Sequence, residues 1–511
     1  MNSTFKTIEI ALIFAVIAFS CSNSKKEKET SQNELPNIIL LMGDDHGWDE
    51  VGYNGHPFIK TPVLDEMAAN GLRFDRFYSG HSSCSPTRGS FMTGRHPNRY
   101  GTFSPNWSIR PEEITIAHLL KNAGYVCAHY GKWHLGPVKK ESPTSPGAMG
   151  FDEWLSHDNF FELNPVLSRN GETPQKIEGE GSQILIEEAI QFIKKSEGKN
   201  KPYFVVVWFG SPHEPYSGLP KDLALYNNLP DSLNNKKVSL TSNETGEKTE
   251  RPLRDVLQER YAEITAMDRA IGNLREFLKK NNLRENTMLW YCGDNGTPSS
   301  AARTGMTIRA QKGSLYEGGV LVPGVMEWPA MIQENAVTKS ISVTSDFLPT
   351  IAELTSQPLP DRPIDGTSLV SLFKKPSSKR KESLFFWKFQ SGKVFDNSAQ
   401  PYIEPRLQEG TTPLVKMMAG KHTRTFRNFK YESISKKDFN GERTMMKDQY
   451  KLIVEGKSSN EKDYELYDIQ NDPAETNNLA DSFPGVVDTM QQQLLIWQQS
   501  VLNSLTGADY K

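Results

Sequence analysis

The 511-residue sequence is poor in cysteine, with only Cys21, Cys84, Cys127 and Cys292. So few cysteines exclude the disulfide framework that stabilises many exported domains. Cys127 and Cys292 lie in apolar, strand-like stretches, GYVCAHY and TMLWYCGDNG, which favour small buried thiols. Cys84 differs from them, because polar and turn-forming residues surround it.

An excess of charge of one sign is also missing. The chain has 59 Lys and Arg against 62 Asp and Glu, a formal net charge of −3 at pH 7. Such a balance provides no basic surface for a polyanion, so nucleic acid is not an expected partner. Any recognition of an anion must come from a local site.

The N-terminal apolar run, residues 8–19, is too short and too abruptly ended for a membrane span. Residues 1–20 are typical of a secretory signal. The ending AFSC resembles the lipobox of bacterial lipoproteins, with Ala18 where Leu is usual. This resemblance implies lipidation of Cys21, a polar tether over 21–35, and a periplasmic or outer-membrane or cell-surface lipoprotein held by its acyl chains. Simple secretion with cleavage nearby is the alternative.

Three apolar runs that end in polar residues dominate the next part of the chain. They are PNIILLMGDD, KPYFVVVWFGSPHEP and NTMLWYCGDNG. Helix-patterned segments such as ITIAHLLKNAG and ERYAEITAMDRAIGNLREFLKKN lie between or beside them. Strands alternating with helices predict an α/β fold, with a mainly parallel sheet covered by helices on both faces. Because ligands bind beyond the carboxyl ends of such strands, the three polar ends are candidates for one site.

The sequence pattern changes after about residue 380. ESLFFWKF, YKLIVE and YELYDI are typical of short antiparallel strands, and VVDTMQQQLLIWQQSVLNSL of a packed helix. Its apolar residues recur at helical spacing: Val487, Met490, Leu494, Trp497 and Val501. We therefore predict a main domain over 36–380 and a smaller α+β domain over 381–511. The polar stretch 219–255 is predicted to be a long surface loop.

The stretch CSPTRGSFMTGR carries the main chemical signal. Ser85 followed by Pro86 favours a helix start, and Gly94 suits the helix end. Cys84 would then stand just outside the positive end of the helix, which attracts anions and lowers the pKa of a thiol. Taken alone, the stretch is also compatible with a capped helix and an incidental cysteine.

This stretch resembles the signature of the formylglycine-dependent (type I) sulfatases of the alkaline phosphatase superfamily, as in exported bacterial polysaccharide sulfatases. The matching residues are Cys84, Pro86, Thr87, Arg88, Thr93, Gly94 and Arg95. The resemblance implies an alkaline-phosphatase-like fold with a large mixed sheet, and a sulfuric ester hydrolase. It also implies that a maturase converts Cys84 to formylglycine before folding, and that the aldehyde hydrate supplies the nucleophilic oxygen.

Two carboxylate-bearing strand ends resemble the metal ligands of that family. They are Asp44 and Asp45 in MGDDHGW and Asp294 and Asn295 in CGDNG, with residue 84 completing the set. Oxygen ligands suit a hard cation, and about six of them suit Ca²⁺ rather than Mg²⁺. Taken separately, these fragments are also common turn and loop-cap signals. Asp294 would in addition help to deprotonate the attacking oxygen.

The remaining catalytic residues are implied by stretches in the same order as in the family. Lys132 in GKWHLG and Lys312 in QKGSLYEGG would hold the sulfate oxygens. Arg88 and His134 would hydrogen-bond the formylglycine hydrate, and His134 would take its proton during sulfate release. His213 in SPHEP would protonate the leaving alcohol.

The resemblance extends over nearly the whole exported chain, with one departure. DFLPTIAEL and ELYDIQNDPAETNNLA also look like family landmarks. EGGVLVP, however, carries Leu321 where many relatives have Arg, so support by an arginine at that point is not expected.

We infer a sulfated carbohydrate as substrate from the exported, tethered location. Residues 157–165, 219–255 and 385–389 are candidates to shape a sugar pocket, although ordinary packing is the better interpretation for 385–389. Two alternatives remain open. One is a phosphonate or phosphate ester hydrolase of the same superfamily, and the other is a surface carbohydrate-binding lipoprotein that has lost catalysis.

Overall fold

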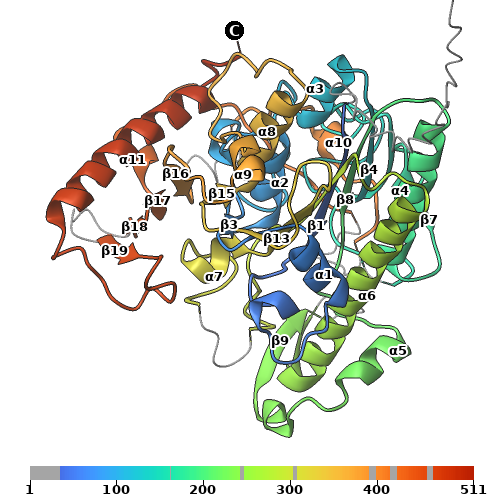
Figure 1. Ribbon diagram of the computed structural model, residues 1–511. Helices are drawn as coiled ribbons and strands as arrows, with labels where there is room; N and C mark the ends of the chain where they lie inside the picture. Colours follow the sequence, from blue (N-terminus) through green and yellow to red (C-terminus); the bar gives the residue numbers. More distant parts are fainter. Residues whose placement is uncertain are drawn as a thin grey trace, which may run out of the picture. The chain divides into compact units, whose positions relative to one another are not determined.

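A ten-stranded mixed sheet lies at the centre of the protein (Figure 1). The computed structural model describes residues 35–161, 163–241, 247–302, 308–390, 399–414, 423–456 and 464–510. In spatial order the strands are β14 (Ala336–Thr338), β2 (Leu72–Phe74), β13 (Gly324–Glu327), β11 (Thr287–Gly293), β1 (Asn37–Gly43), β8 (Tyr203–Trp208), β4 (Val126–Lys132), β5 (Glu153–His157), β6 (Val166–Arg169) and β7 (Gln175–Lys176).

The five strands from β11 to β5 run parallel, and the antiparallel pairs lie nearer the two edges of the sheet. The apolar runs that were predicted to be strands form β1, β8 and β11, and β8 and β11 are buried along their whole length. Continuous burial is the reason for their unbroken apolar sequence, since both sheet faces are covered. The predicted fold class is confirmed.

Alternate residues of β1 divide the core into two layers. Ile38, Leu40 and Met42 pack with α2 (Cys84–Thr93), α3 (Ile116–Asn122), α8 (Phe347–Leu354) and α9 (Val370–Lys374). Ile39 and Leu41 face the other way, toward α1 (Pro62–Asn70), α4 (Gly181–Glu197) and α6 (Leu253–Lys280). The two groups of helices lie on opposite faces of the sheet (Figure 1).

Smaller elements complete the described chain. A three-stranded sheet has the order β12 (Leu321–Val322), β3 (Phe77–Tyr78) and β15 (Ser342–Val343). Short helices are α7 (Glu317–Val320) and α10 (Pro405–Gln408), with 3-10 helices η1 (Gly52–Asn54), η2 (Pro97–Arg99), η5 (Thr344–Asp346) and η7 (Lys436–Phe439).

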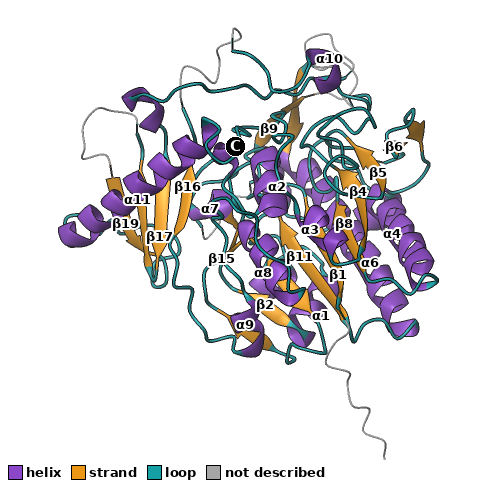
Figure 2. Cartoon of the chain, turned by 90° about the horizontal axis from the view of Figure 1, so that it is seen from above, coloured by secondary structure: helices purple, strands orange, loops and turns teal. Residues whose placement is uncertain are grey.

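The C-terminal part contains the expected antiparallel sheet and packed helix. Its strands are β16 (Leu384–Trp387), β17 (Arg443–Lys447), β18 (Tyr450–Val454) and β19 (Tyr464–Asp468), and α11 (Pro484–Leu505) packs along them (Figure 2). The five apolar positions predicted for this helix are all buried. Phe385 stacks on Trp497 with ring centroids 4.9 Å apart, so residues 385–389 serve packing, as expected.

The prediction of a long surface loop over 219–255 is wrong. This stretch forms α5 (Pro220–Leu223), the 3-10 helices η3 (Ala224–Tyr226) and η4 (Asp231–Asn235), the hairpin of β9 (Lys237–Thr241) and β10 (Lys248–Pro252), and the start of α6. Apolar side chains spaced among its polar residues, including Tyr226, Val238 and Leu240, pack against the first turns of α6. These contacts attach the described parts of the segment to α6.

Residues from Leu35 onward form one compact unit. An extended stretch around Thr425 and Arg427 runs back from the C-terminal part and forms β-bridges with Glu409 and Trp107. The boundary at 380/381 stays a prediction. The signal, the lipidation site Cys21 and the tether lie almost wholly outside the described residues, and within the described residues no helix is long and apolar enough to span a membrane.

A buried ion-pair triad connects the C-terminal sheet to the region of α7. Lys451 on β18 lies 2.8 Å from a carboxylate oxygen of both Glu317 and Glu475, and its side chain is completely buried. Replacement by Ala would leave two buried carboxylates without their cation. We therefore expect Lys451→Ala to lower the free energy of unfolding by about 3–5 kcal/mol, measured by denaturant titration. The exposed Lys447→Ala is the control, and equal small effects of both substitutions would contradict this role.

Candidate active site

The carboxyl ends of the central strands bring the predicted site residues together. Asp44 and Asp45 follow β1, Asp294 follows β11, and Lys132 is the last residue of β4. His213 lies in the loop after β8. Because β1 pairs in parallel with both β8 and β11, these strand ends are neighbours at one edge of the sheet.

Cys84 is the first residue of α2, and Ser83 is the N-cap, with extended backbone and a carbonyl that accepts a helical hydrogen bond. The prediction that Ser85 caps the helix and leaves Cys84 outside it is therefore wrong by two residues. Pro86 is tolerated at the third helical position because the first N–H groups of a helix have no partner within it. Gly94 ends the helix as predicted, at φ 69°.

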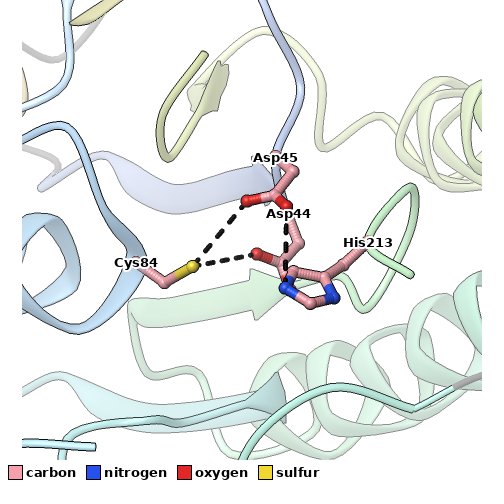
Figure 3. A group of neighbouring side chains, drawn as sticks. All are labelled: Asp44, Asp45, Cys84 and His213. Carbon is pink, nitrogen blue, oxygen red and sulfur yellow. Dashed lines mark hydrogen bonds and ion pairs between the residues drawn. The ribbon is translucent and has the colours of Figure 1, made fainter. Parts of the chain in front are cut away.

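The Cys84 sulfur lies among charged side chains (Figure 3). It is 3.6 Å from Asp44 Oδ1, 3.8 Å from Asp45 Oδ1 and 3.6 Å from Lys312 Nζ. Burial raises the pKa of the thiol to about 12, even though Lys132 and Lys312 act to lower it. The expected lowering by the helix terminus is thus overridden. A thiolate is rare here at neutral pH, which disfavours Cys84 as a thiol nucleophile.

Two lysine side chains reach this acidic group from different parts of the chain. Lys132 Nζ lies 2.6 Å from Asp44 Oδ2, and Lys312 Nζ lies 2.5 Å from Asp45 Oδ1. The Lys132 side chain is fully buried and that of Lys312 is largely so. Both predicted sulfate-binding lysines are therefore present at the strand ends, next to Cys84.

Arg88 is buried one turn into α2. Its Nη2 lies 2.8 Å from Asp294 Oδ2 and 3.4 Å from Asp44 Oδ1, and Nη1 donates to the backbone carbonyl of Lys132 at 3.0 Å. In the described part of the chain the guanidinium thus pairs with carboxylates and not with Cys84. Arg88 thus links three strand ends, those of β1, β11 and β4, beside the acidic group.

Asn295 completes a set of oxygen atoms. Its Nδ2 donates to Asp45 Oδ1 at 2.8 Å, while its Oδ1 is buried and has no hydrogen-bond partner among the described residues. The backbone N–H of Asp45 donates to Asp294 Oδ1 at 2.8 Å. Three carboxylates and one orphaned amide oxygen in one buried place are the donor set that a hard cation such as Ca²⁺ prefers.

The acidic groups differ strongly in their proton affinity. Burial, helped by the carboxylate of Asp44, raises the pKa of Asp294 to about 6. Burial would also raise the pKa of Asp45, but the neighbouring Lys312 ammonium, followed by His213 and Lys132, holds it well below its usual range. A further positive charge near Asp294 would therefore stabilise its ionised form.

His213 lies within the acidic group itself. Possible ligand atoms of Asp44, Asp45, Cys84 and His213 all lie within 4.8 Å of one another (Figure 3). The Nε2 atom of His213 is 3.5 Å from Asp45 Oδ2. The imidazole therefore belongs to the same cluster of side chains as residue 84.

The hydrogen bonds of His213 define which of its nitrogens can titrate. Nδ1 lies 2.5 Å from the carbonyl oxygen of Glu214, which can only accept, so Nδ1 carries a hydrogen. The ring stacks on Phe160 at 4.6 Å between centroids. Burial lowers the pKa of His213 to about 3. Nε2 is therefore the atom that gains or loses a proton.

His134 has the opposite arrangement. Its Nε2 lies 3.0 Å from Asn106 Oδ1, and Arg424 Nη1 donates to the same oxygen. Because arginine only donates, that atom must be the amide oxygen, and Nε2 of His134 must carry the hydrogen. Burial lowers the pKa of His134 well below its usual value. Its lone pair is then on Nδ1, which is buried without a partner among the described residues.

Sequence reasoning missed the residue that fixes the backbone of Asp45. Arg260 on α6 donates to the carbonyl oxygens of Asp45 and Pro212, both at 2.5 Å, and pairs with Glu50. It thereby holds Asp45 at φ 61° and joins the ends of β1 and β8. One arginine inside a long amphipathic helix gave no signal of this role. Asn106 and Arg424 were also missed, because no local pattern marks them. Phe160, in contrast, lies in the segment 157–165, which was a candidate to shape a sugar pocket.

Comparison with known proteins agrees with this geometry. The Sulfatase family model matches residues 36–357. Human arylsulfatase A is 31% identical over 371 residues, which cover 69% of this chain and 70% of that protein. The chain belongs to the sulfatase family. The predicted family and the predicted class of sulfuric ester hydrolase are thereby confirmed.

Further similarities extend to a bacterial relative and a solved structure. An ulvan-active sulfatase of Formosa agariphila is 29% identical over 373 residues, 72% of this chain and 71% of that protein. The crystal structure of Ps i-CgsB in complex with k-i-k-neocarrahexaose is similar over 91% of this chain and 93% of that one, with a TM-score of 0.71 and 23% identity. At 23% identity, the similarity to that crystal structure concerns the fold alone.

Proposed function

We propose that this sulfatase hydrolyses sulfate esters of carbohydrates, with residue 84 acting as formylglycine. The observation that carries the proposal is the convergence of Lys312 and two carboxylates on the Cys84 side chain at the start of a helix, with Lys132 paired to one of those carboxylates. A carbohydrate leaving group is supported by the name of the ulvan-active relative and by the oligosaccharide bound in the similar crystal structure.

The environment of Cys84 favours its conversion over its use as a thiol. Its side chain is 1% exposed, and burial raises its pKa. As an aldehyde hydrate, residue 84 would have one hydroxyl to attack sulfur and a second to expel sulfate as the carbonyl re-forms. Since the folded chain buries the side chain, we propose that the maturase acts before folding.

The charged residues around residue 84 suit a sulfate ester. An ester placed there would have its sulfate oxygens near the ammonium groups of Lys132 and Lys312 and near the N–H groups that open α2. Fixed positive charges that face a site where negative charge develops stabilise the transition state. Arg88 would maintain the position of Asp294 during the reaction.

The two histidines suit opposite proton transfers. Because Nδ1 is held by a carbonyl, His213 would act through Nε2. The negative charge of a bound sulfate ester would raise the low pKa of His213, so that Nε2 could carry a proton and give it to the leaving sugar oxygen. His134 can accept a proton on Nδ1 from the hydrate as sulfate leaves, because Nε2 is held by Asn106. We thus assign the leaving-group acid to His213 and the base for sulfate release to His134.

The acidic set fits a Ca²⁺ ion, which we prefer to Mg²⁺ for its tolerance of an irregular oxygen shell. Asp44, Asp45, Asp294 and Asn295 would hold it, together with an oxygen of residue 84, and the orphaned amide oxygen supports this assignment. When bound, the ion would supply positive charge that polarises the sulfate group and acidifies the attacking hydroxyl.

Fewer observations bear on the alternative functions and on the cellular location. Among the described residues no specific contact favours a phosphonate or phosphate ester over a sulfate ester. The side chains that catalysis needs are present at the strand ends, which disfavours a purely carbohydrate-binding protein. We keep export and anchoring through a lipidated Cys21 as a proposal that is supported by the N-terminal sequence.

Removal of the residue 84 side chain should abolish turnover. We expect Cys84→Ala, expressed with an active maturase, to lose sulfate release from sulfated sugars while it keeps the thermal stability of the parent protein. Released sulfate is measured by ion chromatography. Cys127→Ala, a substitution of another buried cysteine on β4, should retain activity. Substantial sulfate release by Cys84→Ala would contradict the mechanism.

Calcium should stabilise the folded protein through Asn295. At a Ca²⁺ concentration of 100 times Kd, binding adds about 2.7 kcal/mol to the free energy of unfolding. We expect a rise in Tm for the chelator-treated parent protein on adding Ca²⁺, and a smaller rise for Asn295→Ala. Asn503→Ala, on the exposed face of α11, is the control. An unchanged Tm in the parent protein would remove the metal assignment.

His213→Ala should discriminate between leaving groups. A sugar alkoxide needs a proton when it leaves, whereas 4-nitrophenolate is stable without one. We expect kcat/KM for a sulfated sugar to fall by about 10²–10⁴-fold, and that for 4-nitrophenyl sulfate to fall less. His118→Gln on α3 controls for loss of a histidine elsewhere. Equal losses on both esters would exclude the acid role of His213.

A further inference from the structure

A cavity lies where the C-terminal sheet meets the edge of the central sheet. It has a volume of about 430 Å³ and is bordered by the ends of β2 and β14, by the segment 376–382 and by the turn 448–449 between β17 and β18. Ligand sites of proteins are often cavities of this size at junctions between packed elements. Among the described residues that line this cavity, none is assigned to catalysis or to the metal site.

The lining of this cavity carries more positive than negative charge. Its basic residues are Arg76, Lys339, Lys379 and Arg380, and its acidic residues are Glu382 and Asp448. The whole chain, in contrast, has a formal net charge of −3. A local excess of positive charge in a concave surface attracts anions and raises their local concentration.

Arg380 supplies the cavity with a guanidinium that is fixed in position. Its side chain is 3% exposed, and its Nη1 lies 2.7 Å from Asp346 Oδ2. Its Nε donates to the carbonyl oxygen of Glu382 at 3.1 Å. Its Nη2 is buried and has no hydrogen-bond partner among the described residues. Because a buried donor without an acceptor is uncommon, an oxygen of a bound anion is the partner that this N–H group lacks.

Hydrogen bonds between separate parts of the chain hold the walls of the cavity. The N–H of Arg380 donates to Ser340 Oγ at 2.9 Å, which attaches the segment 376–382 to the end of β14. Arg76 Nη1 lies 3.5 Å from the carbonyl oxygen of Asp448, so the turn of the C-terminal sheet lies next to the end of β2. A ligand would bind to walls that are already in place and would lose less free energy to ordering.

We propose that this cavity is a second, non-catalytic site that binds an oxyanion, either the sulfate or carboxylate group of a saccharide or the sulfate ion that hydrolysis releases. A guanidinium donates in one plane to such anions, and the two lysines add attraction. Val337, which is 40% exposed on β14, and Pro376 offer apolar surface to the C–H groups of a sugar ring. The choice of these ligands rests on the proposed sulfatase function.

A purely structural role of these residues predicts a different result. Arg380 would then only neutralise the buried Asp346, whose other carboxylate oxygen accepts from the N–H of Thr367 at 2.7 Å. Removal of Arg380 would leave that carboxylate buried and unpaired, so its substitution would destabilise the protein without testing binding. Lys339 and Lys379 are exposed, and their reactivity reports on the cavity without any substitution.

The test is the acetylation of Lys339 and Lys379 by acetic anhydride at constant ionic strength, followed residue by residue with peptide mass spectrometry on the parent protein. A sulfated carrageenan hexasaccharide is the main probe, and the same sugar without sulfate groups and sodium sulfate are the comparison probes. We expect the sulfated sugar, at about ten times its Kd from the same titration, to slow acetylation of both lysines about 10-fold. The exposed Lys199 and Lys201, between α4 and β8, are controls whose rates should not change.

The comparison probes identify the source of the anion. Slowing by the sulfated sugar alone supports a group carried on a saccharide, whereas equal slowing by sodium sulfate supports the free ion as a sufficient ligand. Unchanged rates with both sulfate-bearing probes would overturn the proposal. Equal slowing by the sulfate-free sugar would overturn it too, because the cavity would then not recognise the anion.

Arg76→Gln provides a second measurement. We expect it to raise the Kd of the protecting probe about 10-fold, because a charge-assisted hydrogen bond is lost, and to leave kcat/KM for 4-nitrophenyl sulfate unchanged. Arg254→Gln is the matched control, since Arg254 is also half-buried and also donates to backbone carbonyls, at 2.6 Å and 3.3 Å. An unchanged Kd for Arg76→Gln would contradict the assignment. Hydrolysis of 4-nitrophenyl sulfate by the parent protein tests the sulfatase function separately, so the failure of one proposal is distinguished from the failure of the other.

Discussion

The structure depends on the mutual neutralisation of charges that are buried at the ends of the central strands. Three carboxylates and three cations meet there: Asp44, Asp45 and Asp294 with Arg88, Lys132 and Lys312. Any one of these charges left alone in this place would cost several kcal/mol, so none can be removed without a response from the others. Strand register, the start of α2 and the contacts of Arg260 all serve to keep these groups in place.

This balance is also what makes the site suitable for chemistry. Lys132 and Lys312 each neutralise a carboxylate here, and each could neutralise a sulfate oxygen instead if another cation paired with that carboxylate. In the proposed metal site such a cation would lie near the orphaned oxygen of Asn295 and near Asp294, whose pKa is raised. The two histidines are fixed in opposite tautomers by Glu214 and Asn106, and in the proposed mechanism they would make the proton transfers on either side of residue 84.

The sequence predicted the strands and their polar ends because a buried parallel strand must be apolar throughout and can change only at its end. β1 and β11 are examples. Both are apolar along their length, and their acidic residues come directly after the strand ends. It did not predict that Ser83 caps α2, because cap preference alone cannot choose between neighbouring serines. Nor did it predict the high thiol pKa of Cys84, since burial depends on packing from the whole chain.

Long-range contacts explain the other features that the sequence did not predict. Arg424 and Asn106 are more than 300 residues apart in the sequence. They meet through backbone pairing that no local pattern encodes. The stretch 219–255 has the polar composition of a loop, yet a few apolar side chains anchor it to α6. In both cases the deciding interaction is tertiary, so local preference was overruled.

The most direct test of this account is peptide mass spectrometry across residue 84, on protein coexpressed with a formylglycine-generating enzyme. Conversion replaces the CH₂–SH end of cysteine by an aldehyde and lowers the peptide mass by about 18 Da. We predict that loss in the folded, active protein. An unmodified cysteine at residue 84, with a maturase shown to be active on a control protein, would contradict the account and point to binding without sulfate ester hydrolysis.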